Sequence, residues 1–83
     1  MSVKVTTVRQ LDETLEAIAR GEYLDDVTIF FEDTPHWEKK LLVIPNYLDN
    51  GETVLLDEEN KVHWVISEPT SLSTAEDIFS YYY

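Results

Sequence analysis

Apolar and polar residues follow two different periods in the first quarter of the chain. Residues 3–7 alternate, which predicts a short strand with one inward face. Thr7 and Gln10 then form a capping-box pair, and Arg20-Gly21 marks a helix end. The apolar residues between these signals share one helical face; they are Val8, Leu11, Leu15 and Ile18. We therefore expect a strand followed directly by an amphipathic helix.

Two further segments, in the middle of the chain, are predicted to form strands. Residues 27–31 are β-branched and aromatic and lie between acidic and proline-containing segments, which is typical of a strand. Residues 41–44 are apolar without alternation, as in a strand that is buried on both faces. Pro45 ends this second block, because proline cannot donate to a sheet ladder.

The last part of the chain predicts a hairpin and a helix. Residues 53–56 and 61–66 flank an acidic four-residue turn, and Trp64 faces inward while His63 faces the other side. Ser73 with Glu76 fits a second capping box after Pro69. The apolar residues that follow share one helical side; they are Ala75, Ile78, Phe79 and Tyr82.

The chain has 83 residues, and chains of this length form a single domain. We therefore expect residues 1–83 to fold as one α+β domain with the element order β-α-β-β-β-β-α. This order predicts a mostly antiparallel sheet of four to five strands with two helices packed on it. A hydrophobic fraction of 43%, with only two glycines and three prolines, distinguishes the chain from an acidic disordered one.

The balance of charges narrows the class of partner. Six Lys and Arg residues oppose 17 Asp and Glu residues, which gives a net charge of −11. Binding to nucleic acid depends on neutralising phosphates with Lys and Arg, so this surface would repel nucleic acid. The chain has no cysteine and no apolar run of membrane-spanning length, and its first seven residues lack the apolar segment and cleavage site expected of a secretory leader. We expect a cytoplasmic protein that does not bind nucleic acid or a membrane directly.

Motifs for catalysis, metals and cofactors are missing from the sequence. Neither His36 nor His63 has a second histidine at zinc-ligand spacing. The acidic stretch around Gly51 fails the calcium-loop pattern, because Leu48 falls where an oxygen ligand is needed. We expect a protein that is not an enzyme and has no cofactor. One alternative stays open: a carboxylate pair could act as general acid and base if it had a desolvated pocket.

The acidic residues gather in four groups. One lies on the outer face of the first predicted helix, where a solvated surface is the ordinary explanation. The others fall at predicted strand ends or turns; they are Glu22, Asp25 and Asp26, then Glu32 and Asp33, then Asp57, Glu58 and Glu59. Carboxylates four residues apart on a helix, or two residues apart on a strand, are separated by about 6 to 7 Å, which is comparable to the spacing of phosphates along a nucleic-acid strand. A rigid acidic surface can therefore occupy a site built for phosphates.

An acidic surface also needs an apolar anchor, because exposed ion pairs each contribute little binding energy. Trp37 lies in a polar stretch and is the expected anchor, although its ring could instead fold back over the core. Tyr23, Tyr47 and the terminal Tyr81-Tyr82-Tyr83 are further aromatic candidates.

In size, charge and lack of catalytic motif, the whole chain resembles two bacterial and phage groups. One comprises small acidic DNA mimics such as uracil-DNA glycosylase inhibitor, anti-CRISPR and anti-restriction proteins; the other comprises immunity proteins that neutralise nuclease toxins. This resemblance rests on bulk properties and implies no site residues. It implies an inhibitor that covers a basic, nucleic-acid-binding surface of an enzyme. The alternative is a non-catalytic structural or regulatory subunit that binds through an apolar or tyrosine surface.

Overall fold

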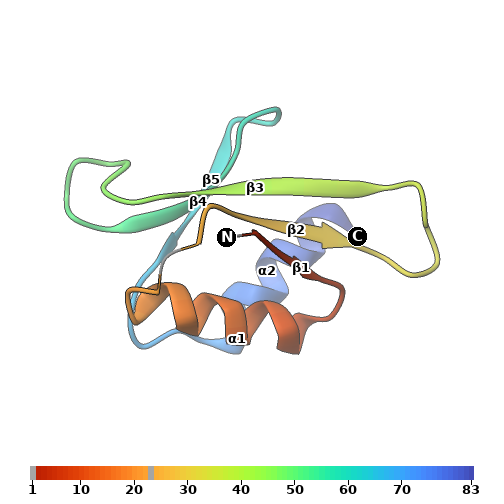
Figure 1. Ribbon diagram of the computed structural model, residues 1–83, viewed down its shortest axis with the longest axis horizontal. Helices are drawn as coiled ribbons and strands as arrows, with labels where there is room; N and C mark the ends of the chain where they lie inside the picture. The colour runs from red at the N-terminus through yellow and green to blue at the C-terminus, as the bar shows by residue number, and fades with distance from the viewer. Residues whose placement is uncertain (1, 23) are drawn as a thin grey trace.

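The computed structural model describes residues 2–22 and 24–83, which form one mixed sheet and two helices (Figure 1). In chain order the elements are β1 (Ser2–Val5), α1 (Val8–Ala19), β2 (Asp26–Phe30), β3 (Glu38–Ile44), β4 (Thr53–Asp57), β5 (Val62–Ile66) and α2 (Leu72–Tyr82). The predicted α+β class and element order are confirmed.

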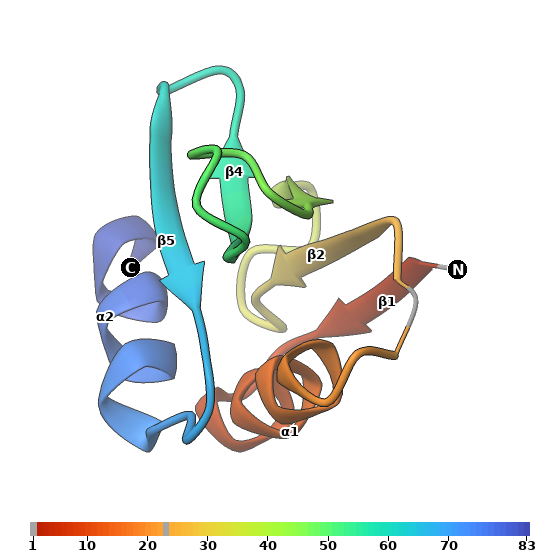
Figure 2. The ribbon, with the colours of Figure 1, turned by 90° about the vertical axis from the view of Figure 1, so that its left-hand side faces the viewer.

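The strands follow each other across the sheet in the order β1-β2-β3-β4-β5. β1 and β2 are parallel, and α1 is the crossover helix that a parallel pair requires. The other three pairs are antiparallel, as short connections allow. The sheet twists strongly, so that β1 lies near α1 while β5 runs beside α2 (Figure 2).

The start of α1 follows its sequence signals closely. The Thr7 hydroxyl oxygen accepts from the backbone N–H of Gln10 at 3.1 Å. The side-chain oxygen of Gln10 accepts from the backbone N–H groups of Thr6 and Thr7, so the predicted capping box is confirmed. The chain leaves the helix after Arg20 through Gly21, whose φ of 92° lies in the region that favours glycine.

The predicted capping box of α2 is wrong. The helix begins at Leu72 with Ser71 as its N-cap, so Ser73 already lies inside the first turn and cannot cap it. The Ser71 side chain makes no capping hydrogen bond to the helix backbone. The expected inward side is confirmed: Ala75, Ile78 and Phe79 are buried, and Tyr82 is half-buried. Within the described ranges, neither helix is long and apolar enough to cross a membrane.

Both helices cover the same face of the sheet, which we call the inner face. Pairing places Val27 beside Leu41 and Leu55 beside Trp64, so these side chains share that face. The predicted inward position of Trp64 and outward position of His63 are thereby confirmed. The core between sheet and helices is built mainly from Val5, Leu11, Leu15, Ile18, Val27, Ile29, Leu41, Leu55, Ile66, Ala75, Ile78 and Phe79.

Neither of the helices in residues 2–22 and 24–83 covers the outer face, so the expectation that residues 41–44 are buried on both faces is wrong. Only Leu41 is fully buried in that block; the other three side chains are half-buried. The connection between β3 and β4 folds back toward this face instead. The ring of Tyr47 lies 5.6 Å from that of His63, which is the outward neighbour of Leu56 in the sheet. The loop therefore shields part of the outer face in place of a helix.

Candidate functional site

A buried polar cluster lies on the inner face, at the end of the sheet where β4 finishes. Asp57 is only 1% exposed and is the last residue of β4. Its carboxylate accepts from the Tyr82 hydroxyl at 2.5 Å and from the Lys39 ammonium at 3.3 Å. A third hydrogen bond comes from the backbone N–H of Asn60 at 3.1 Å. The cluster therefore joins β3, the β4–β5 turn and the last turn of α2.

Sheet register explains why these groups meet. Leu42 pairs with Leu56, so Asp57 follows beside Leu41 on the inner face. Lys39 lies two residues before Leu41 and therefore points to the same face. Its ammonium reaches both Asp57 and Glu59, each at 3.3 Å.

The protonation states in the cluster support one another. Burial opposes the charged form of Asp57, but hydrogen bonds from Tyr82, Asn60 and Lys39 outweigh it and lower the pKa of the carboxyl. Burial also opposes the charge on Lys39, yet Asp57 and Glu59 raise the pKa of its ammonium. Burial and the bond to Asp57 both raise the pKa of the Tyr82 hydroxyl. At neutral pH the cluster holds a carboxylate, an ammonium and a neutral phenol.

These states suit a structural role. A lysine or tyrosine that acts as nucleophile or base needs a lowered pKa, and both are raised here. What the cluster does is hold the β4–β5 turn and the end of α2 in fixed positions. Within the described part of the chain, no group of three His, Asp or Glu side chains could hold a metal ion.

Replacing Tyr82 by phenylalanine tests the cluster through its pH dependence. We expect Tyr82→Phe to lower the free energy of unfolding by about 1.5 kcal/mol at pH 7, since a hydrogen bond to a charged group is lost. The raised pKa of Tyr82 means that its contribution is complete below about pH 10, the unfolded value. Above that pH the contribution shrinks, because the unfolded phenol loses its proton first. The difference between wild type and variant, measured by urea unfolding from pH 7 to 11, should therefore fall.

Tyr81→Phe is the matched control for this measurement. Tyr81 is 51% exposed, and no hydrogen bond of its hydroxyl occurs within the described residues. We expect its loss to change stability little at any pH. A Tyr82→Phe effect that equals the Tyr81→Phe effect, or that stays constant up to pH 11, would contradict the role given to Tyr82.

Aromatic side chains surround the polar cluster. Trp37 stacks on Phe31 with ring centroids 5.1 Å apart, and it also contacts Tyr82 at 5.9 Å. The Tyr83 ring meets Phe31 edge-on at 5.3 Å. Tyr81 and Tyr83 are 51% and 86% exposed, whereas Trp37 is half-buried against the core. Trp37 therefore folds back onto the core, and the tyrosines project from the same end.

Two groups of predicted acids lie at this end of the sheet. Glu32 and Asp33 follow β2 directly, in the loop that leads to β3. β2 and β4 both run antiparallel to β3, so these two strands end on the same side of the sheet. Glu58 and Glu59 follow β4. All four are exposed. We call this region the acidic–aromatic end and define it as Glu32, Asp33, Glu58, Glu59, Trp37, Tyr81 and Tyr83.

A shallow groove adjoins the acidic–aromatic end. It has a volume of about 360 Å³ and lies between the last turn of α2 and the start of α1. Phe31, Phe79, Tyr83 and Val8 supply its apolar lining. It is large enough for one apolar side chain of a partner.

The third predicted acidic group lies elsewhere. Asp26 begins β2, at the opposite end of that strand, and its side chain is 13% exposed. It accepts from Ser2 at 3.0 Å and lies 3.9 Å from the Lys40 ammonium. Glu22 is exposed and pairs with Arg20 at 3.0 Å. Asp25 is exposed, and its carbonyl accepts from the backbone N–H of Val43.

The structure thus places the predicted partner-binding acids on two separate parts of the surface, and it shows that Asp57 is buried. Asp57 cannot meet a partner's basic side chain, because its carboxylate is buried and already engaged within the chain. Sequence reasoning missed Lys39 and Tyr82 as its partners. Tyr23, another aromatic candidate, lies outside the described residues.

Comparison with known proteins identifies no relative of this chain. The chain matches no model of a known protein family, no curated protein and no solved structure.

Proposed function

We propose that the protein is a small acidic inhibitor or immunity-type protein that covers a basic, nucleic-acid-binding surface of an enzyme such as a nuclease. In this proposal it is a DNA mimic of the anti-CRISPR, anti-restriction or toxin-immunity kind and acts in the cytoplasm. It performs no catalysis and needs no cofactor.

The observation that carries the proposal is the composition of the acidic–aromatic end. Four exposed carboxylates come from the connections that follow β2 and β4, and one of them, Glu59, also pairs with Lys39; two exposed tyrosines lie at the end of α2. Carboxylates steer a basic partner and favour rapid, salt-dependent association. Tyrosines are among the residues that most often supply binding energy at the centre of an interface. The buried Lys39–Asp57–Tyr82 cluster limits the conformational entropy that binding would cost.

Affinity capture at two salt concentrations tests this function. Wild-type protein and a variant with Glu32→Lys, Asp33→Lys and Glu58→Lys serve as paired baits in lysate of the source cell, with mass spectrometry as the readout. The proposal predicts that wild type captures a basic nucleic-acid enzyme at low salt and that the captured amount falls at high salt. The variant should not capture this enzyme. A partner that is not basic and resists salt would overturn it.

One observation favours the second candidate function, a non-catalytic structural or regulatory subunit of a larger assembly. Tyr83 and Tyr81 are strongly exposed at the end of α2, and part of the outer sheet face is apolar and has no helix over it. In that case these surfaces would form the interface, and the acids would serve solubility alone.

The double variant Tyr81→Ser with Tyr83→Ser separates the two functions. It leaves Tyr82 and its bond to Asp57 in place, and circular dichroism checks that the variant is folded before its binding is measured. If the protein is an assembly subunit, we expect its association to be lost. If it is an acidic inhibitor, we expect an affinity loss of roughly tenfold with the salt dependence unchanged. Isothermal titration with the captured partner at two salt concentrations distinguishes these results.

A further inference from the structure

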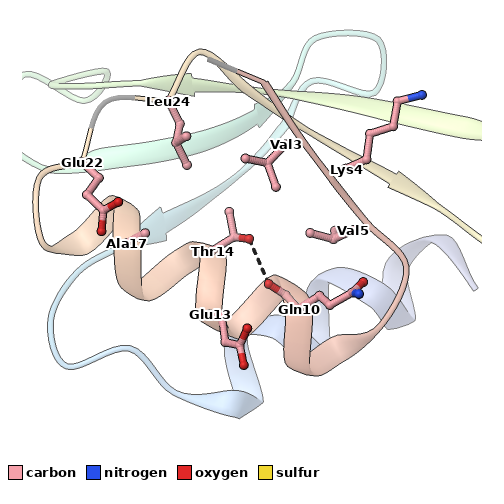
Figure 3. Close-up of a pocket in the computed structure, with 9 residues that line it drawn as sticks. All are labelled: Val3, Lys4, Val5, Gln10, Glu13, Thr14, Ala17, Glu22 and Leu24. Carbon is pink, nitrogen blue, oxygen red and sulfur yellow. Dashed lines mark hydrogen bonds between the residues drawn. The ribbon is translucent and has the colours of Figure 1, made fainter.

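A second surface lies between β1 and α1 and contains no residue of the acidic–aromatic end. It is an open groove of about 610 Å³ (Figure 3). Val3 and Val5 form its wall on the sheet side, and Leu24 closes one end. The helix contributes one stripe at helical spacing, which consists of Gln10, Glu13, Thr14 and Ala17. This stripe borders the buried face of α1 and shares Thr14 with it, while Gln10 and Glu13 are exposed toward the groove.

β1 is an edge strand, and this decides what kind of ligand the groove can take. Its one strand partner is β2, and no described strand pairs with its other side. An edge strand presents a row of backbone N–H and C=O groups that an extended peptide can pair with. A strand added beside β1 would place every second side chain on the inner side of the sheet, above α1. The groove lies in that position.

The charges around the groove select the side chains of such a strand. Glu13 is exposed and has no hydrogen bond or ion pair among the described residues, and Glu22 stands at the other end with one exposed partner, Arg20. Between them lie the small or apolar Ala17 and Leu24. The lining also includes a cation, Lys4, but its side chain alternates with Val3 and Val5 on β1 and pairs with Glu38 at 3.7 Å. A strand that fits therefore carries a small apolar side chain flanked by cationic ones.

The same charges argue against a second copy of this chain as the occupant. Two molecules that each carry a net charge of −11 repel each other.

We propose that an extended, cationic segment of a partner protein adds to the sheet at β1, with a small apolar side chain in the groove and Lys or Arg side chains beside Glu13 and Glu22. The backbone of β1 supplies the main-chain hydrogen bonds, and the stripe on α1 selects the side chains. This inference does not rest on the acidic–aromatic end, because it uses other residues and another type of contact.

Titration with a designed peptide tests the inference. The probe is the end-blocked heptapeptide Thr-Lys-Thr-Val-Thr-Lys-Thr, in which Lys, Val and Lys share one face. We expect amide NMR shifts confined to residues 2–5 and 10–17 and a dissociation constant of about millimolar order. Methylating the central valine nitrogen should weaken binding about tenfold, because a main-chain donor is removed.

Two pairs of protein variants locate the site. Ala17→Arg fills the groove and should weaken binding about tenfold, whereas Glu16→Gln makes the same charge change outside it. Glu13→Gln should weaken binding about threefold, again against Glu16→Gln as the control. The NMR spectrum of each variant also reports whether it is folded.

Each other result counts against the inference. The inference is wrong if no binding is detected at peptide concentrations several times the expected dissociation constant. It is also wrong if Ala17→Arg binds the peptide as tightly as wild type does, or if the NMR shifts centre on residues 32–33 and 58–59. Concentration-dependent shifts of residues 2–5 without peptide would assign β1 to a second copy instead.

Discussion

Replacing Asp57 by alanine is expected to lower the free energy of unfolding by about 3 kcal/mol at pH 7, the largest stability effect that we predict. The carboxylate is 1% exposed and accepts from Tyr82, Lys39 and Asn60. Removing it leaves the Tyr82 phenol without its acceptor and the nearly buried Lys39 ammonium with only the exposed Glu59 as partner. Breaking one side of a buried pair costs about this much. Urea unfolding followed by circular dichroism measures the loss.

Two further variants show whether the loss of unfolding free energy comes from leaving the Lys39 ammonium without Asp57. Glu58→Ala removes the neighbouring, exposed carboxylate and should change stability by less than about 0.5 kcal/mol. The triple variant Lys39→Met, Asp57→Leu and Tyr82→Phe removes all three polar partners together and should recover most of the loss. If Asp57→Ala behaved like Glu58→Ala, the cluster would not support this end of the fold.

Stability should also fall in acid for the same reason. The lowered pKa of Asp57 means that its contribution is present above the unfolded value, about 3.9, and disappears as the pH falls through the folded value. Asp57→Ala should therefore differ less from wild type at pH 3 than at pH 7.

The second large effect is expected on association rate. The triple variant Glu32→Lys, Asp33→Lys and Glu58→Lys should bind the captured basic enzyme roughly tenfold more slowly at low ionic strength. The reason is that three exposed carboxylates at one end attract the partner before contact. The dependence of the rate on salt should flatten as well, because screening has less attraction to weaken. Stopped-flow or biosensor kinetics at several salt concentrations measure both.

The control variant for this experiment has the same net charge, but its three substitutions are at other positions in the chain. Glu16→Lys, Glu68→Lys and Asp77→Lys reverse three exposed acids outside the acidic–aromatic end. If binding depends on that end, the control should associate at nearly the wild-type rate. Equal slowing of both variants would mean that total charge matters and the placement of the acids does not.

The fold could be predicted from the sequence because its signals are local. The 3.6-residue spacing and the capping pair give α1, and alternation gives the inner face of β5. The start of β3 was missed because Glu38, Lys39 and Lys40 resemble a solvated stretch. Alternation back from Leu41 would have placed Lys39 on the inner face.

The site was harder to predict because its contacts connect distant parts of the chain. Tyr82 and Asp57 are 25 residues apart, and only the packing of α2 on the sheet brings them together. Without that contact, Asp57 looks like its exposed neighbours Glu58 and Glu59. The division of the acids between two ends likewise depends on strand order, which local patterns do not contain.

Competition with DNA tests the central claim most directly. A fluorescent duplex is bound to the captured enzyme, and anisotropy is followed as this protein is added. We predict that wild type displaces the duplex completely and that Glu32→Lys, Asp33→Lys and Glu58→Lys needs a roughly tenfold higher concentration. If the duplex stays bound when the enzyme is saturated with this protein, the acidic–aromatic end does not occupy a phosphate site.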